Sequence, residues 1–562
     1  MKMFPKTALL LTILCLGACR SVPSDGSGAA RLYDGIDRYH RPITTDSPAA
    51  QQWFDQGVQL LYGFNHDEAI RSFQRAADLD PGSPMPWWGI AYAHGININD
   101  PKMTEARWRD AYAAAVKAIE RVSAGSAVEA DLVRAIAERY SWPPPAEQRT
   151  LDLAYADAMK AVHERHPDDP DVAVLYAESL MDLQPWDYWT NEGAPRGRAA
   201  EIVAVLASVL AAHPDHPGAA HFYIHAVEAS SDPDRAIVAA DSLRNRIPGA
   251  GHLVHMPSHI YVRVGRYADA ADANVLAVAA DRRYLKTAPP AKAYWIYYAH
   301  NLHFLAYASM MEGRYHEAIR AARALESDLP EPIVRDFAGL IEGILGTTFH
   351  VMVRFGRWEE ILAEPQRAEH RLVSRAVRSY ARGLAFSALG RIEEARSEIA
   401  AFESAAAEIP GDWWVFNNKV DTVLPIARAM LEGELAFREG RLEVAFAALR
   451  SAVEMEDALI YDEPPAWMLP VRHALGALLM SAGHHAEAEE VYREDLRRNR
   501  DNGWALLGLR QALTAQGTAD REVFLDAKLK FAFARADVRP SSSCLCEPRE
   551  NWSARGEGEI DY

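Results

Sequence analysis

A helical repeat constrains the fold of this chain more than any other feature of its sequence. Ala236 and Ala270 hold equivalent places in two similar segments and lie 34 residues apart. Less regular copies of the same segment are marked by Ala318, Ala395, Ala445 and Ala488. Periods of about 20–50 residues are typical of arrays in which each unit buries its apolar face against its neighbours. No β pattern of comparable length occurs, so the sequence predicts an all-α array of antiparallel helical hairpins.

The clearest copy is the segment WFDQGVQLLYGFNHDEAIRSFQRAADLDP, which begins at Trp53. Its large residues can fill the seam between two helices, its small residues permit close approach, and its proline ends the second helix. These positions are Trp53, Gly57, Ala69, Phe73, Ala76 and Pro81. Their spacing resembles the tetratricopeptide repeat (TPR) over most of residues 49–510. The resemblance implies a TPR-like α-solenoid, in which the first helix of each hairpin lines a concave face. HFYIHAVEAS and GHLVHMPSHIYVRVGRY further resemble a group of large bacterial TPR lipoproteins, and this likeness implies no particular activity.

The N-terminal residues are typical of an export signal. Residues 1–18 combine lysines with an apolar run that is too short to span a bilayer as a helix. The sequence LGAC, which ends at Cys19, resembles the lipobox of bacterial lipoproteins. This resemblance implies cleavage before Cys19, lipidation of its thiol, and anchoring in a membrane outside the cytoplasm. Arg20, where an inner-membrane retention signal would have Asp, favours the outer membrane with the body facing the periplasm. The alternative is an ordinary signal peptide with a chance cysteine.

Composition bounds the rest of the chain. The net charge of −18 over 562 residues argues against a nucleic-acid partner, and no nucleotide-binding fingerprint occurs at a convincing place. The expected parts are a signal peptide (1–18), a flexible tether (19–48), N-terminal TPR-like repeats with insertions (49–215), histidine-rich units (216–335), degenerate repeats (336–520) and a tail (521–562). Cys544 and Cys546 in the tail can be an oxidised local pair or soft metal ligands, and their spacing does not choose between the two.

Histidine recurs at fixed places in three successive units. With the central alanine counted as position 20, His221, His255 and His303 all fall at position 5. Position 9 is also histidine in two of these units. Both positions lie about 100° round the helix from the packing seam, so we expect them to face the groove. The predicted metal ligands are His221, His225, Glu228, His252, His255, His259, His300 and His303.

This pattern favours a metal centre. Histidines at i and i+4 share one helical face, and packed helices lie roughly 8–10 Å apart, so imidazoles from neighbouring hairpins can converge. Imidazole with carboxylate suits Zn, Fe, Mn or Cu, and this number of ligands allows a two-metal site. Pro257 fits the first turn of a helix, which places the start of that helix near His255.

Two further features are predicted to face the same groove. Glu178 and Asp182 take groove positions if Ala177 is aligned with a small seam residue. The aromatic insertion at residues 186–189 can fold over the groove as a lid or wall, or it can form a loop with a small core of its own.

Two functions follow from these observations. In the first, a lipid-anchored envelope protein carries a transition metal on its concave face, for metal-assisted chemistry or for metal binding and delivery. If the site is catalytic, Glu228 or Glu178 serves as a ligand or general base. In the second, the array is a non-enzymatic scaffold that binds a protein, a peptide or a small-molecule ligand, and the histidines provide polar contacts.

Overall fold

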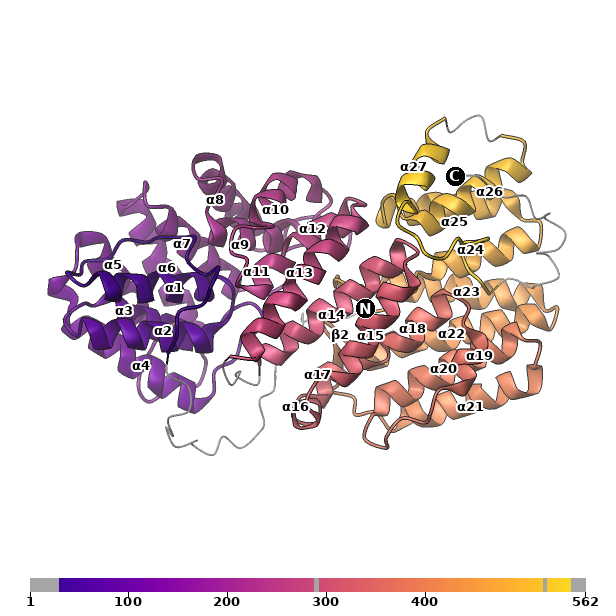
Figure 1. The fold of residues 1–562 in the computed structure, drawn as a ribbon, viewed down its shortest axis with the longest axis horizontal. Helices are drawn as coiled ribbons and strands as arrows, with labels where there is room; N and C mark the ends of the chain where they lie inside the picture. Colours follow the sequence, from indigo (N-terminus) through magenta and orange to yellow (C-terminus); the bar gives the residue numbers. More distant parts are fainter. Residues whose placement is uncertain (1–29, 288–292, 519–522, 547–562) are drawn as a thin grey trace, which may run out of the picture. The chain divides into compact units, whose positions relative to one another are not determined.

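The computed structural model describes residues 30–287, 293–518 and 523–546. Within these ranges the regular secondary structure is helical except for one hairpin of two short strands, as Figure 1 shows. The predicted signal peptide and the lipidation position Cys19 lie outside the described residues. The chain divides into two compact units. Unit 1 comprises residues 1–260 and 275–294, and unit 2 comprises residues 261–274 and 295–562.

Unit 1 is built from successive helices that pack on their neighbours in the chain. Its helices are α1 (Pro48–Tyr62), α2 (His66–Leu79), α3 (Met85–His94), α4 (Glu105–Glu120), η1 (Val122–Ala124), α5 (Ala127–Glu138), α6 (Arg149–Arg165), α7 (Pro170–Asp182), α8 (Ala199–Ala212), α9 (Pro217–Val227), η2 (Pro233–Ala236), α10 (Ile237–Leu243) and α11 (Gly251–His255). Helices α12 (Pro257–Arg263), α13 (Tyr267–Leu285) and α14 (Tyr294–Met311) have residues assigned to both units.

Unit 2 continues the same architecture. Its remaining elements are α15 (Tyr315–Ser327), α16 (Glu331–Asp336), α17 (Ala338–Leu345), α18 (Thr347–Arg354), α19 (Trp358–Ala363), α20 (Leu372–Ala388), α21 (Ile392–Ala407), β1 (Trp414–Val415), β2 (Asn418–Lys419), α22 (Val420–Arg438), α23 (Leu442–Asp457), α24 (Val471–Ser481), α25 (His485–Arg498), α26 (Gly503–Ala515) and α27 (Leu525–Ala532). A disulfide joins Cys544 to Cys546, which favours the local oxidised pair. None of the described helices is both long and apolar enough to span a bilayer.

The packing of α1, α2 and α3 shows why the repeat pattern folds into hairpins. Ser47 caps α1 by accepting a hydrogen bond from a backbone N–H of the first turn, and a proline follows it. Phe73 of α2 is fully buried, and its ring lies against Gly57 of α1 and Gly89 of α3. The two glycines let three helices approach one aromatic ring. The predicted all-α array of antiparallel hairpins is confirmed.

The segment before α1 is packed rather than extended into solvent. The side chain of Gln59 accepts a hydrogen bond from the backbone N–H of Arg38 and donates one to the carbonyl of Ile36. Arg41 donates to Asp171 of α7 over 2.6 Å, and both side chains are buried. Residues 30–47, which the sequence assigned to a flexible tether, therefore belong to the fold. The reason is their content of apolar and aromatic residues, which the Ser- and Gly-rich residues before them obscure.

Substitution of Gly57 by Ala is predicted to destabilise unit 1. The added Cβ would lie 2.4 Å from the Phe73 ring, closer than packed atoms allow. Overpacking typically costs about 1–3 kcal/mol, which outweighs the gain in helix propensity of up to about 1 kcal/mol. Thermal unfolding followed by circular dichroism should show a lower midpoint for Gly57→Ala. Gly411→Ala, at a position with open space around it, is the control and should leave the midpoint unchanged.

Candidate metal centre

The predicted histidines of unit 1 lie on three short helices. Helix α9 begins at a proline, its first turn is capped by His216, and it presents His221 and His225 one turn apart. His252 and His255 belong to α11, and His259 belongs to α12. The expected helix start near His255 is confirmed, because α12 begins at Pro257. The short helix α11, which begins at Gly251, was not expected. The proline after it opens a second helix, so the chain forms two short helices where one was expected.

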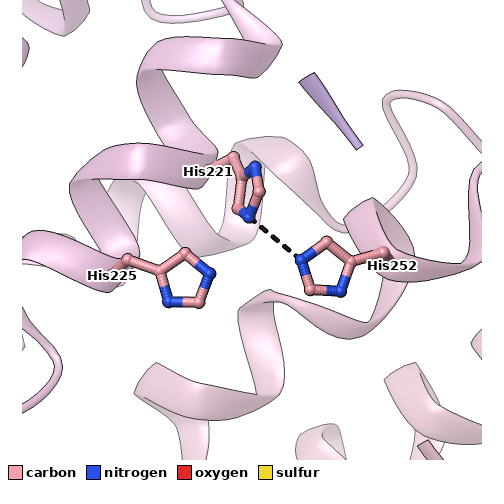
Figure 2. Close-up of side chains that lie close together, drawn as sticks. All are labelled: His221, His225 and His252. Atoms are coloured by element: carbon pink, nitrogen blue, oxygen red, sulfur yellow. Dashed lines mark hydrogen bonds between the residues drawn. The ribbon is translucent and has the colours of Figure 1, made fainter. Parts of the chain in front are cut away.

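Three imidazoles, those of His221, His225 and His252, come together in unit 1, as Figure 2 shows. We call them the three-histidine set. Each has a ring nitrogen within 4.8 Å of a ring nitrogen of the other two, and the Nε2 atoms of His221 and His252 are 3.1 Å apart. All three side chains are buried, with exposed fractions of 4% or less. Buried imidazoles in this arrangement can hold a metal ion.

Hydrogen bonds fix the proton positions on two of the three rings. Nδ1 of His221 lies 2.6 Å from the carbonyl oxygen of Tyr62, and Nδ1 of His225 lies 2.7 Å from Oε1 of Glu228. A carbonyl or a carboxylate only accepts, so both Nδ1 atoms carry the proton and both Nε2 atoms carry a lone pair. Nε2 of His225 is buried and has no hydrogen-bond partner among the described residues. This is the arrangement in which histidine ligates a metal while its second nitrogen is held by an outer partner.

Burial also sets the charge of these groups. It lowers the pKa of His221 well below its ordinary value and lowers the pKa of His225 as well. Both rings are therefore neutral near pH 7, which is the state that binds metals. Burial alone would raise the pKa of Glu228, but the His259 and His225 rings beside it lower that pKa to about 2. The cluster thus combines neutral imidazoles with an ionised carboxylate.

Glu228 joins the histidines of two repeat units. One carboxylate oxygen bonds to His225 on α9, and the other lies 2.6 Å from Nδ1 of His259 on α12. Nε2 of His259 in turn lies 2.8 Å from Nε2 of His255. The five predicted histidines of unit 1 therefore form two groups, with Glu228 in contact with one member of each.

Aromatic rings contact the three-histidine set. Phe64, in the turn between α1 and α2, stacks on His252 and meets the edge of His221, with ring centroids 5.5 and 4.7 Å apart. Trp186 meets the His225 ring at 5.1 Å. Trp189 donates a hydrogen bond to a backbone carbonyl of α9. The insertion at residues 186–189 thus packs on α9 and supplies a wall beside the histidines. Sequence reasoning missed Phe64, whose only signal is an aromatic residue in a turn, where polar residues are usual.

The carboxyl pair of Glu178 and Asp182 lies buried on α7, which packs against α9. Asp182 forms an ion pair with Arg139, the residue that follows α5. Burial raises the pKa of Glu178, and burial together with the Glu178 charge raises that of Asp182 well above its ordinary value. Two neighbouring buried carboxyls cannot both ionise readily, so the pair holds a proton more tightly than an isolated carboxyl does. Both side chains are buried, and their predicted orientation toward the groove stays a prediction.

His300 and His303 belong to unit 2, so their predicted convergence with the histidines of unit 1 stays a prediction. Within unit 2, both rings contact the ring of Phe416 in the β1–β2 turn. Nε2 of His303 also lies 3.1 Å from the sulfur of Met468. The sequence pattern did not identify Met468, because a single methionine outside the repeat positions carries no spacing signal.

Comparison with known proteins adds little to this geometry. No protein-family model matches the chain, and no curated protein matches it by sequence. Solved structures that align with it include the human IFIT1 dimer with m7Gppp-AAAA, at 10% identity and a TM-score of 0.30, over 87% of this chain and 91% of that one. The APC/C hetero-tetramer Cut9-Hcn1 aligns at 13% identity and a TM-score of 0.31, over 86% and 76%. Likenesses this distant transfer no ligand or partner.

One buried carboxyl of unit 2 was not anticipated from the sequence. Glu434 of α22 has an oxygen within 4.8 Å of both disulfide sulfurs. Burial raises its pKa from 4.5 to about 7, although Arg438 opposes the shift. Between pH 4.5 and 7 the folded state therefore binds this proton more tightly than the unfolded chain does. It follows that the Glu434 contribution to stability becomes more favourable as the pH falls through this window.

Replacement of Glu434 by Gln is predicted to stabilise unit 2 at pH 8, by about 3 kcal/mol from the size of the shift. The gain arises because the variant no longer buries a charge. Chemical unfolding at pH 8 and pH 5 should show the full gain at the higher pH and only about a quarter of it at the lower pH. Glu443→Gln, at an exposed position of α23, should change stability at neither pH. Equal changes in stability for Glu434→Gln at pH 8 and pH 5 would contradict a raised pKa of Glu434 in the folded state.

Proposed function

We propose that this protein binds a divalent transition metal ion in unit 1, through the Nε2 atoms of His221 and His225 and a ring nitrogen of His252. The observation that carries the proposal is a pair of outer hydrogen bonds, which His221 donates to the Tyr62 carbonyl and His225 donates to Glu228. They leave lone pairs on two Nε2 atoms. Neutral imidazole ligands suit Zn²⁺, Cu²⁺ and Fe²⁺, with Mn²⁺ as a further candidate, and Zn²⁺ is the ion used in the tests below.

Three histidine ligands leave a fourth position on a tetrahedral ion. Structural zinc sites are closed by four protein ligands, whereas sites that carry out chemistry keep one position for water or substrate. The proposed centre therefore suits metal-assisted hydrolysis or reversible delivery better than a structural role. The carboxyl pair on α7 holds a proton more tightly than an isolated carboxyl does, and Tyr188 interacts with both this pair and Glu228. The carboxyl pair is our candidate proton donor if the centre is catalytic.

We further propose that the metal-binding array works in the bacterial envelope, anchored by lipid on Cys19. The support is the LGAC sequence at the end of a signal-like segment. The disulfide between Cys544 and Cys546 is consistent with an oxidising compartment.

A scaffold function is the second candidate, and one feature of unit 1 favours it. A groove of about 1270 Å³ runs between residues 38–44, the start of α5, and the turns before α7 and α9. Both signs of charge line it, including Arg41, Arg165 and Asp168. Such a surface suits a polar peptide, and it requires no metal.

Purified full-length protein, stripped with a chelator and reloaded with Zn²⁺, is predicted to retain one ion that the His225→Ala/His252→Ala variant loses. The reason is the removal of two of three ligands. Elemental analysis after gel filtration measures the difference. His213→Ala, which removes an exposed histidine from the turn before α9, is the matched control and should retain the ion. Equal zinc content in the wild type and the double variant would exclude this site. Zinc-free protein that binds a peptide equally well with and without EDTA would favour the scaffold.

Replacement of Glu228 by Gln is predicted to weaken zinc affinity by about 10–100-fold, the usual effect of losing an outer-shell carboxylate. The amide is neutral and holds the His225 proton on Nδ1 less firmly. Competition with a chromophoric chelator at pH 7.5 gives the affinity. Glu120→Gln, at an exposed position of α4, should bind as tightly as the wild type. A Glu228→Gln protein that folds normally and keeps wild-type affinity would show that the carboxylate does not position a ligand.

A further inference from the structure

A second group of donor atoms lies in unit 2, apart from the residues of the centre proposed in unit 1. His303 on α14 contacts Met468 in the segment before α24, and the ring of His350 on α18 packs on Trp467, the residue next to Met468. We call His303, His350 and Met468 the His–Met cluster. Nε2 of His303 lies 3.1 Å from Sδ of Met468, and each residue is 2% exposed. The hydroxyl of Thr347 donates to the same sulfur over 3.7 Å. Two groups from distant parts of the sequence thus meet at one thioether.

Ordinary hydrogen bonding does not account well for this contact. A thioether is a weak acceptor, and buried polar groups usually have stronger partners. Nδ1 of His303 and Nδ1 of His350 are both buried and have no hydrogen-bond partner among the described residues. This differs from unit 1, where a carbonyl and a carboxylate hold the Nδ1 atoms of His221 and His225.

The surroundings of the cluster are aromatic and sulfur-rich. The Phe416 ring lies 5.6 Å from that of His303, and the Trp467 ring lies 4.9 Å from that of His350. The Trp467 indole donates to the sulfur of Met430. Burial lowers the pKa of His303 to about 3, with a further contribution from His350, and lowers that of His350 to about 4. Both rings are therefore neutral and able to act as ligands at physiological pH.

We propose that His303, His350 and Met468 bind Cu(I). Thioether sulfur is a soft ligand that selects Cu(I) over Zn²⁺ and other harder divalent ions, and imidazole suits copper as well. The donor set is also uncharged. The cost of burying an ion rises steeply with its charge, so a neutral buried set favours a monovalent ion over a divalent one. The site in unit 1 differs in this respect, because the Glu228 carboxylate contacts one of its ligands, His225.

The test is an anaerobic titration of the full chain with Cu(I) against a chromophoric competitor. It uses the His225→Ala/His252→Ala background, so that the three-histidine set does not contribute. In that background Met468→Leu removes the sulfur and nearly conserves the volume. It is expected to weaken Cu(I) binding by at least about tenfold, as the loss of a ligand should. Met430→Leu removes a neighbouring buried sulfur that is not in the cluster, and it should bind as the parent does.

X-ray absorption of the copper-loaded parent should show sulfur at bonding distance, and Met468→Leu should lose that signal. Nitrogen ligands alone in the parent, or equal affinities for Met468→Leu and Met430→Leu, would overturn the proposal. If Met468→Leu does not fold, His350→Phe replaces it, since a phenyl ring retains the contact with Trp467 while removing both nitrogens. The zinc test of unit 1 and the copper test of unit 2 compare variants of different residues, so either proposal can fail without the other.

Discussion

The carboxylate of Glu228 is the contact on which the arrangement of unit 1 depends most. It is buried between two helices of different hairpins, and each of its oxygens faces an imidazole. A buried charge is costly unless polar neighbours compensate it, and here the neighbours are His225 and His259. The carboxylate thereby fixes the proton of His225 on Nδ1. The lone pair of His225 therefore lies on Nε2, as a consequence of the hydrogen bond between Nδ1 and Glu228.

Much of the fold follows from the sequence, because the repeat reports directly on packing. The spacing of Phe73 and its glycine neighbours is a physical requirement of three helices around one ring, so it is visible without coordinates. The histidine face was predictable for a similar reason. A helix has a fixed period, and residues that share a repeat position share a direction.

Other features of the site depend on chain segments that carry no period. Phe64 and Trp186 reach the histidines from turns, both with positive backbone φ angles, and no spacing rule relates them to the repeat. The depth of burial was also missed. Position within a repeat gives the side on which a residue lies, but burial depends on everything packed above it. Glu178 and Asp182 illustrate this, since their side was inferred and their buried pairing was not.

The packing of the segment before α1 determines how far the helices can lie from a lipid anchor. A 29-residue linker from Cys19 to α1 would span up to roughly 100 Å when extended. Because the chain is already held to α1 from about residue 31 onward, only about 12 residues remain to span the gap, or roughly 40 Å. If Cys19 carries the lipid, unit 1 is confined to a thin layer next to the bilayer.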